Sequence, residues 1–341
     1  MKNKSMIIPY SLSHFLVDFA CAIFMFQHVY GTSKWYILVI LYNFCAFALQ
    51  MPIGLLVDKW NKNAVAAAAG CLSVALAYIT MLFAYPSVIL LGIGNALFHV
   101  GGGTDVLNSS TEKASMLGVF VSPGAFGIYF GTMLGKQGKV STMLFILVLL
   151  IAAVIILLWD YIPTKSFVSN NVEVSFESAT NKGALLAIIC FFIVVILRSY
   201  MGMKKFTWGG EANWGAFLIC AVVFGKMIGG FLGDRFGIKQ VAFLSLTVSA
   251  ILFVFSENIP ALGVLGMFCF NMTMPLTLWA IARVLKDCKG FSFGLLTVAL
   301  FLGMLPAYLS NQVQFHTAIG CVVVSIVSLV IMMIGIKKVV K

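Results

Sequence analysis

The chain has 341 residues, of which 61% are hydrophobic and only 10% charged, and its mean hydropathy is +1.05. These few polar residues cannot cover the surface of a water-soluble protein of this size. The composition therefore excludes a soluble globular protein and predicts a chain embedded in lipid. The net charge of +11 could indicate a nucleic-acid partner, but the basic residues stand at the ends of apolar runs, and we expect no nucleic acid.

Apolar runs follow one another along the chain, most of them close to the roughly 20 residues that a helix needs to cross a bilayer. The twelve runs cover residues 6–30, 35–57, 64–84, 87–108, 114–135, 140–159, 183–203, 212–233, 239–256, 260–283, 290–310 and 315–336. They predict an all-α membrane protein with twelve transmembrane helices. The long polar stretch 160–182 is expected to be a cytoplasmic linker between residues 1–159 and residues 183–341.

Lysine and arginine are unevenly distributed over the loops between these runs. With the N-terminus placed in the cytoplasm, cytoplasmic segments hold 15 of them, outer loops hold five, and two fall inside helices. Positive residues accumulate on the cytoplasmic side of membrane proteins. We therefore expect both termini to be cytoplasmic, in a multi-pass protein of the bacterial cytoplasmic membrane.

The first run carries a carboxylate near its middle. Asp18 lies about 18 Å along a helix axis from the start of the run, and His14 precedes it by one turn. Together with Cys21, Met25 and His28 they share one helix face, which predicts the lining of an aqueous cavity. Ionisable groups at membrane depth are costly and are functional candidates by default. The alternative is a purely structural pairing of Asp18 with a buried donor.

A short motif after the second run recurs after the eighth, 176 residues later. Its shared positions are Gly54, Asp58 and Lys59 in the first copy and Gly230, Asp234 and Arg235 in the second. A constant offset near half the chain length suggests two similar halves. The motif resembles the cytoplasmic loop motif of major facilitator superfamily transporters. That resemblance implies two pseudo-symmetric six-helix bundles that rock about a central substrate, with the two motif copies forming a cytoplasmic gate.

The fourth run places Asn95 and His99 on one helix face, and we predict that both line the same cavity as Asp18. The Phe98-His99 pair, together with the stretch from His14 to Asp18, looks like the fosmidomycin-resistance-type exporters of that superfamily.

The fifth run contains Gly118, Pro123 and Gly127. This spacing resembles the fifth-helix motif of facilitator-superfamily antiporters, although Ser122 stands where that motif has glycine. The resemblance implies export by exchange with protons.

Three further polar residues lie in the second half of the chain. Two interpretations stay open for Arg198: its side chain extends outward toward Lys204 and Lys205, or it faces the cavity. Lys226 could likewise extend toward the helix end or pair with a cavity carboxylate or an anionic substrate. Asn271 lies mid-helix shortly before a proline and is a further cavity candidate.

These patterns predict a secondary active transporter that exports a small organic solute in exchange for protons and works as a monomer in lipid. Proton-coupled uptake or exchange of an organic anion is the alternative within transporters. A channel, or a non-transporting scaffold or receptor, is the alternative of another class. The sequence contains no nucleotide-binding loop, HExxH or GxSxG motif, and its eight cysteines lack C-x-x-C spacing, so we expect no enzyme, no cofactor and no metal.

Overall fold

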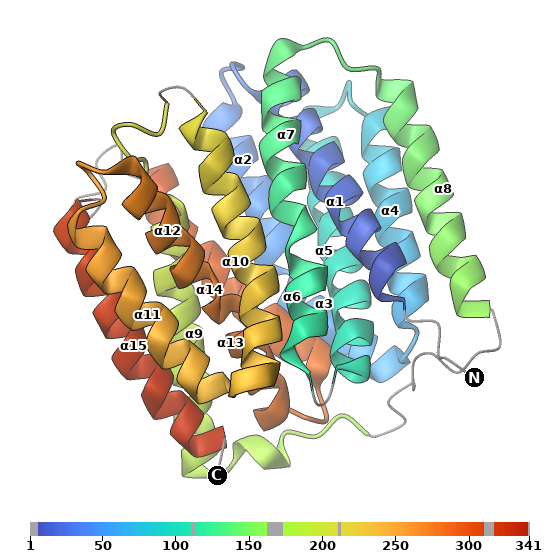
Figure 1. The fold of residues 1–341 in the computed structure, drawn as a ribbon. Coiled ribbons are helices and arrows are strands. Elements are labelled where there is room, and N and C mark those ends of the chain that lie inside the picture. Colours follow the sequence, from blue (N-terminus) through green and yellow to red (C-terminus); the bar gives the residue numbers. More distant parts are fainter. Residues whose placement is uncertain (1–5, 111–112, 162–172, 211–212, 310–316, 340–341) are drawn as a thin grey trace. The chain divides into compact units, whose positions relative to one another are not determined.

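The computed structural model describes residues 6–110, 113–161, 173–210, 213–309 and 317–339 (Figure 1). Within these ranges the regular structure is entirely helical. The first half contains α1 (Ile7–Phe24), α2 (Trp35–Asn43), α3 (Gln50–Trp60), α4 (Asn63–Ile79), α5 (Ala84–Ser109), α6 (Ala114–Val121), α7 (Pro123–Gln137) and α8 (Thr142–Tyr161). The second half contains α9 (Lys182–Gly202), α10 (Trp214–Phe236), α11 (Ile238–Val254), α12 (Pro260–Asn271), α13 (Thr273–Val284), α14 (Lys289–Leu309) and α15 (Ala318–Val339).

The helices coincide with the predicted apolar runs, and in the described part of the chain ten spans are long and apolar enough to cross a membrane. The helices α4 and α11 are also apolar but have only 17 residues each. Part of the predicted linker, residues 162–172, lies outside the described residues. Glu177–Ala179, near its end, forms one turn of 3-10 helix.

Several of the spans are interrupted rather than continuous. The first passes from α1 into a π-helical segment, Met25–Val29, and a second π segment, Phe44–Ala48, joins α2 to α3. Breaks at Pro123 and before Thr273 separate α6 from α7 and α12 from α13. Pro123 and Pro275 explain the two breaks, because a proline ring disturbs the preceding turn but fits the first turn of a new helix. Hydropathy alone did not predict these interruptions.

The described helices fall into two compact units. The first contains α1 to α5, α7, α8 and the beginning of α14, up to Val298. The second contains α6, α9 to α13, the rest of α14 and α15. The predicted boundaries at 159 and 183 remain a prediction.

In the first unit, α1 packs on α7, and α5 packs on α4 (Figure 1). Asp105 on α5 braces this arrangement, because it accepts hydrogen bonds from Tyr10 Oη at 2.5 Å and from Asn63 Nδ2 at 2.7 Å. Small residues bring the backbones together: a methyl group at Gly101 would meet the Ala67 nitrogen at 2.5 Å. Close approach of this kind is typical of helix packing in membranes. The Tyr10–Asp105 hydrogen bond thereby holds α1 against α5 at a point eight residues before Asp18.

Candidate functional site

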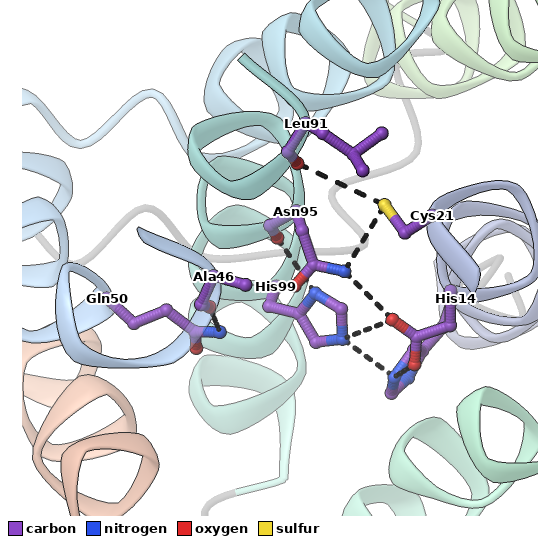
Figure 2. Close-up of polar contacts among 8 residues, drawn as sticks. His14, Cys21, Ala46, Gln50, Leu91, Asn95 and His99 are labelled. Atoms are coloured by element: carbon purple, nitrogen blue, oxygen red, sulfur yellow. Dashed lines mark hydrogen bonds and ion pairs between the residues drawn. The ribbon is translucent and has the colours of Figure 1, made fainter. Parts of the chain in front are cut away.

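The first unit contains a buried cluster formed by Asp18 and His14 of α1 and by Asn95 and His99 of α5 (Figure 2). Asp18 Oδ1 accepts a hydrogen bond from Asn95 Nδ2 at 2.9 Å. Asp18 Oδ2 lies 3.2 Å from His14 Nε2, and Oδ1 lies 3.6 Å from His99 Nε2. The two histidine Nε2 atoms are 2.9 Å apart, and no member of the cluster is more than 8% exposed. The structure thus brings together the four residues that the first and fourth runs predicted.

The hydrogen bonds define where protons reside in this cluster. His99 Nδ1 lies 2.8 Å from the Asn95 carbonyl oxygen, which can only accept, so Nδ1 carries the proton. Nε2 of a neutral His99 is then an acceptor, and His14 Nε2–H can donate either to it at 2.9 Å or to Asp18 Oδ2 at 3.2 Å. One more proton would turn one ring into an imidazolium beside the Asp18 carboxylate. The cluster can therefore take up one proton beside the negative charge of Asp18 and release it again.

Glycines of α7 form the wall behind Asp18. A methyl group at Gly124 would collide with the His14 ring and the Asp18 carboxylate, and one at Gly127 would collide with the α1 backbone at Phe15. The sequence motif identified Gly127 but not the role of Gly124, because nothing in the sequence shows which helix α7 faces. Cys21 is a further titratable group at the cluster, 3.7 Å from Asn95 Nδ2.

A metal ion is the alternative to a proton as the cation bound by this cluster. One ligand atom each from His14, Asp18 and His99 lies within 4.8 Å of the others, and the described residues contain no second group of this kind. Two imidazoles bound to one tetrahedral Zn²⁺, at roughly 2.0–2.1 Å each, would place their nitrogens about 3.3 Å apart. The observed 2.9 Å is the length of a direct hydrogen bond between the rings and favours a shared proton.

His28 was predicted to continue the same face. It lies in the π-helical segment after α1, and its ring packs against those of Phe24 and Tyr78, with centroids 5.3 and 6.4 Å away. The wider π turn changes the register that the α-helical spacing assumed.

The predicted residues of the second half lie in the second unit. Arg198 of α9 is only 6% exposed, and its Nη2 donates to Thr277 Oγ1 at 3.2 Å, so the outward-extended interpretation is wrong. Asn271 is buried at the end of α12 and donates to the Met267 carbonyl at 2.8 Å. Lys226 is partly exposed on α10.

The first copy of the loop motif binds a helix N-terminus within the first unit. Asp58 accepts hydrogen bonds from the backbone nitrogens of Gly290 and Phe291, both at 2.8 Å, at the start of α14. A methyl group at Gly54 would collide with the Gly290 carbonyl. A carboxylate at this end of a helix satisfies free N–H groups and opposes the helix dipole. Lys59 is exposed.

The second copy repeats this contact within the second unit. Asp234 accepts hydrogen bonds from the nitrogens of Ala114 at 2.6 Å and Ser115 at 3.0 Å, at the start of α6. Adding 176 to 58, 114 and 115 gives 234, 290 and 291, so each contact maps onto the other by the sequence offset. Gly230 packs on Ala114 as Gly54 packs on Gly290. Exposed Arg235 lies against the Phe236 ring, its guanidinium carbon 5.2 Å from the centroid.

The antiporter-like motif is divided between the units. Gly118 belongs to α6, where a methyl group would meet the Lys226 carbonyl oxygen of α10 at 2.7 Å. Pro123 starts α7 of the first unit, and Gly127 packs on α1. Between them, Ser122 Oγ donates to the Gly118 carbonyl at 2.5 Å. The motif therefore marks the point where the chain passes from one unit to the other.

No protein-family model matches the chain, and no curated protein sequence does. Solved structures do match. The chain is similar to a major facilitator superfamily transporter, FucP, in the outward conformation, at 16% identity and a TM-score of 0.68, covering 98% of this chain and 99% of that one. It is also similar to a variant of the Escherichia coli fucose:proton symporter FucP, at 15% identity and a TM-score of 0.69, with the same coverage.

Coverage of 98% of the chain at these scores shows that the chain has the fold of major facilitator superfamily transporters. With the ten long apolar helices, the fold makes it a multi-pass integral membrane protein. The fosmidomycin-resistance type rests on the two short sequence segments alone.

Proposed function

We propose that the chain is a secondary active transporter of the major facilitator superfamily, with twelve transmembrane helices in two six-helix bundles, that couples the movement of a small organic solute to protons. The observation that carries the proposal is the buried cluster of Asp18, His14, His99 and Asn95. A buried carboxylate beside two imidazoles is energetically costly in lipid, and ionisable groups at this depth usually have a function. The function proposed for this cluster is to bind and release one proton in each transport cycle.

Coupling requires that the cluster meet water on one side of the membrane and then on the other. In a dry site a lone carboxylate takes up a proton or pairs with a cation, whereas in a wet cavity it ionises. His14, His99 and Cys21 are titratable groups of the described residues that contact Asp18 or its partner Asn95, and α7 approaches Asp18 through Gly124 and Gly127. The proton is therefore shared among Asp18, His14 and His99.

The loop-motif contacts of Asp58 and Asp234 are the proposed cytoplasmic gate. Each holds a helix start through two hydrogen bonds and a glycine contact. Such contacts are discrete, made or broken, and suit a two-state element that a substrate can bias.

The direction of transport is proposed as export, from the likeness of the Gly118–Gly127 stretch to antiporter motifs and of the His14–Asp18 and Phe98-His99 segments to exporters. Uptake or exchange of an organic anion is the competing function, and buried Arg198 favours it. We place the protein in the bacterial cytoplasmic membrane as a monomer, with no enzymatic activity.

Orientation gives a direct prediction. Reporter tags at residue 1, in the stretch 165–175 and after residue 341 should all be cytoplasmic, because cytoplasmic loops then carry 15 of the Lys/Arg residues against five outside. Impermeant labelling of intact and lysed cells measures this. Labelling of the 165–175 tag in intact cells would contradict the two-halves model.

Proteoliposomes loaded with a pH-sensitive dye test the function. When a transported solute is added outside, protons should cross in a fixed ratio to the solute. A first panel of solutes is fucose, lactate, succinate and benzoate, with addition of water as the control. Pretreatment with a chelator tests the alternative that the cluster binds a metal ion. Solute flux without proton movement would favour a channel, and binding without flux would favour a receptor.

A further inference from the structure

The second unit contains a buried cation that forms no ion pair with the described residues of that unit. Arg198 lies on α9 with 6% of its surface exposed, and its Nε atom is buried without a hydrogen-bond partner among the described residues. A guanidinium carries five N–H donors. In the described part of the chain we find one acceptor for them, Thr277 Oγ1 at 3.2 Å.

The Thr277 hydroxyl is a weak partner for a buried guanidinium. The Thr277 hydroxyl donates its own proton to the Thr273 carbonyl at 2.6 Å, so it offers Arg198 only a neutral lone pair. Buried charges in proteins are normally paired with an opposite charge. Arg198 therefore lacks what its burial requires.

The carboxylates described in the second unit are engaged or exposed elsewhere. Glu257 pairs with Lys204 at 2.6 Å. Asp234 accepts the two backbone hydrogen bonds at the start of α6. Glu177 is exposed in the short 3-10 turn that precedes α9. None of these described groups forms an ion pair with Arg198.

The internal repeat places Arg198 where the first unit has its cluster. Adding 176 to 18 gives Val194, which lies one helical turn before Arg198 on the same face of α9. Likewise, α13 with Thr277 follows the position equivalent to Asn95, which is Asn271 at the end of α12. The helix pair that carries the ionisable cluster in one unit thus carries a lone cation in the other.

We propose that Arg198 binds the carboxylate of the transported solute, so that the substrate is an organic anion. This deepens the proposed transport function and concerns the charge of the substrate, whichever way it moves. The free Nε–H and a neighbouring N–H of the guanidinium form the planar fork that holds a carboxylate through two parallel hydrogen bonds.

Binding to the purified full-length protein tests the inference without a gradient. Unfolding temperature is followed against increasing lactate, succinate, citrate and benzoate, each paired with its uncharged amide, and against phosphate and sulfate. At least one carboxylate should stabilise the wild type while its amide does not, because a ligand of the folded state raises the unfolding temperature by mass action. Arg198→Gln should bind it about 100-fold more weakly. Arg198→Lys, which keeps the charge but loses the fork, should bind it about tenfold more weakly.

Lys205→Gln is the matched control, since it removes one positive charge from an exposed position of the same unit and should change nothing. If Arg198→Gln does not fold, Arg198→Lys carries the test, and wild-type affinity in it overturns the inference. So does a panel in which no carboxylate exceeds its amide, or in which phosphate or sulfate alone stabilises. Carboxylate binding that needs Arg198 but drives no proton movement would refute the proposed coupling and leave this inference standing. If neutral fucose moves with protons and Arg198→Gln does not change this movement, the inference is refuted and the proposed proton coupling remains.

Discussion

Asp18→Asn should insert and fold but lose proton-driven accumulation of solute. Asparagine keeps the shape and an acceptor oxygen for Asn95, while it fixes the neutral state that Asp18 would otherwise reach only by protonation. One pH unit across the membrane is worth about 1.4 kcal/mol per proton, so coupling to one proton supports about tenfold accumulation. In the variant this ratio should fall to about one. Downhill exchange of solute should persist, because binding does not need the gradient.

Asp105→Asn is the control for this variant. Asp105 is as buried as Asp18, at 7% exposure, and belongs to the same unit, but it accepts from Tyr10 and Asn63 instead of facing histidine. We expect it to lower the unfolding temperature while leaving the solute-to-proton ratio unchanged. If well-folded Asp18→Asn still accumulates solute, this residue is not the proton carrier. The same loss of coupling in Asp105→Asn would show that any buried carboxylate of the unit has this effect.

Much of the first unit's cluster was predictable because each half of it obeys a local rule. The spacing of His14 and Asp18 on one helix, and of Asn95 and His99 on another, defines two polar faces in lipid. That the two faces meet is a tertiary fact, set by the fit of α1 against α5 and α7. Gly124 was missed for the same reason, since a small residue matters only where another side chain needs its space.

Arg198 illustrates the limit more sharply. Its sequence neighbours Lys204 and Lys205 favoured a side chain that extends out of the helix bundle. Nothing in the local sequence indicated that the side chain is buried instead. The deciding contact is with Thr277, 79 residues away. The π segments at Met25–Val29 and Phe44–Ala48 were likewise hidden, because an extra residue in a turn leaves the hydropathy of the run unchanged.

The 176-residue offset was visible in the sequence and predicted two equivalent halves. It did not show what Asp58 and Asp234 bind. The structure supplies this: each carboxylate holds the first backbone N–H groups of a helix in its own unit, α14 for Asp58 and α6 for Asp234. Two equivalent contacts with separate partners can be broken one at a time, which makes the proposed gate experimentally accessible.

Asp58→Asn should loosen the start of α14 and leave α6 unaffected, and Asp234→Asn should do the opposite. An asparagine side chain has one acceptor oxygen and no charge, so each variant loses one of two charge-assisted hydrogen bonds, worth about 1.5–3 kcal/mol. Amide hydrogen exchange at residues 290–291 or 114–115 should then be about 10- to 100-fold faster. The measurement is exchange mass spectrometry on protein in lipid nanodiscs, with each variant serving as the other's control.

The same two variants test the gate itself. If these contacts close the cytoplasmic side, each variant should shift the population toward the inward-open state, and the double variant should shift it further and slow net transport. Cytoplasmic alkylation of single cysteines placed in turn along the inner half of α1 reports the shift. Faster exchange at the predicted amides with unchanged alkylation and transport would show that Asp58 and Asp234 are helix caps and nothing more.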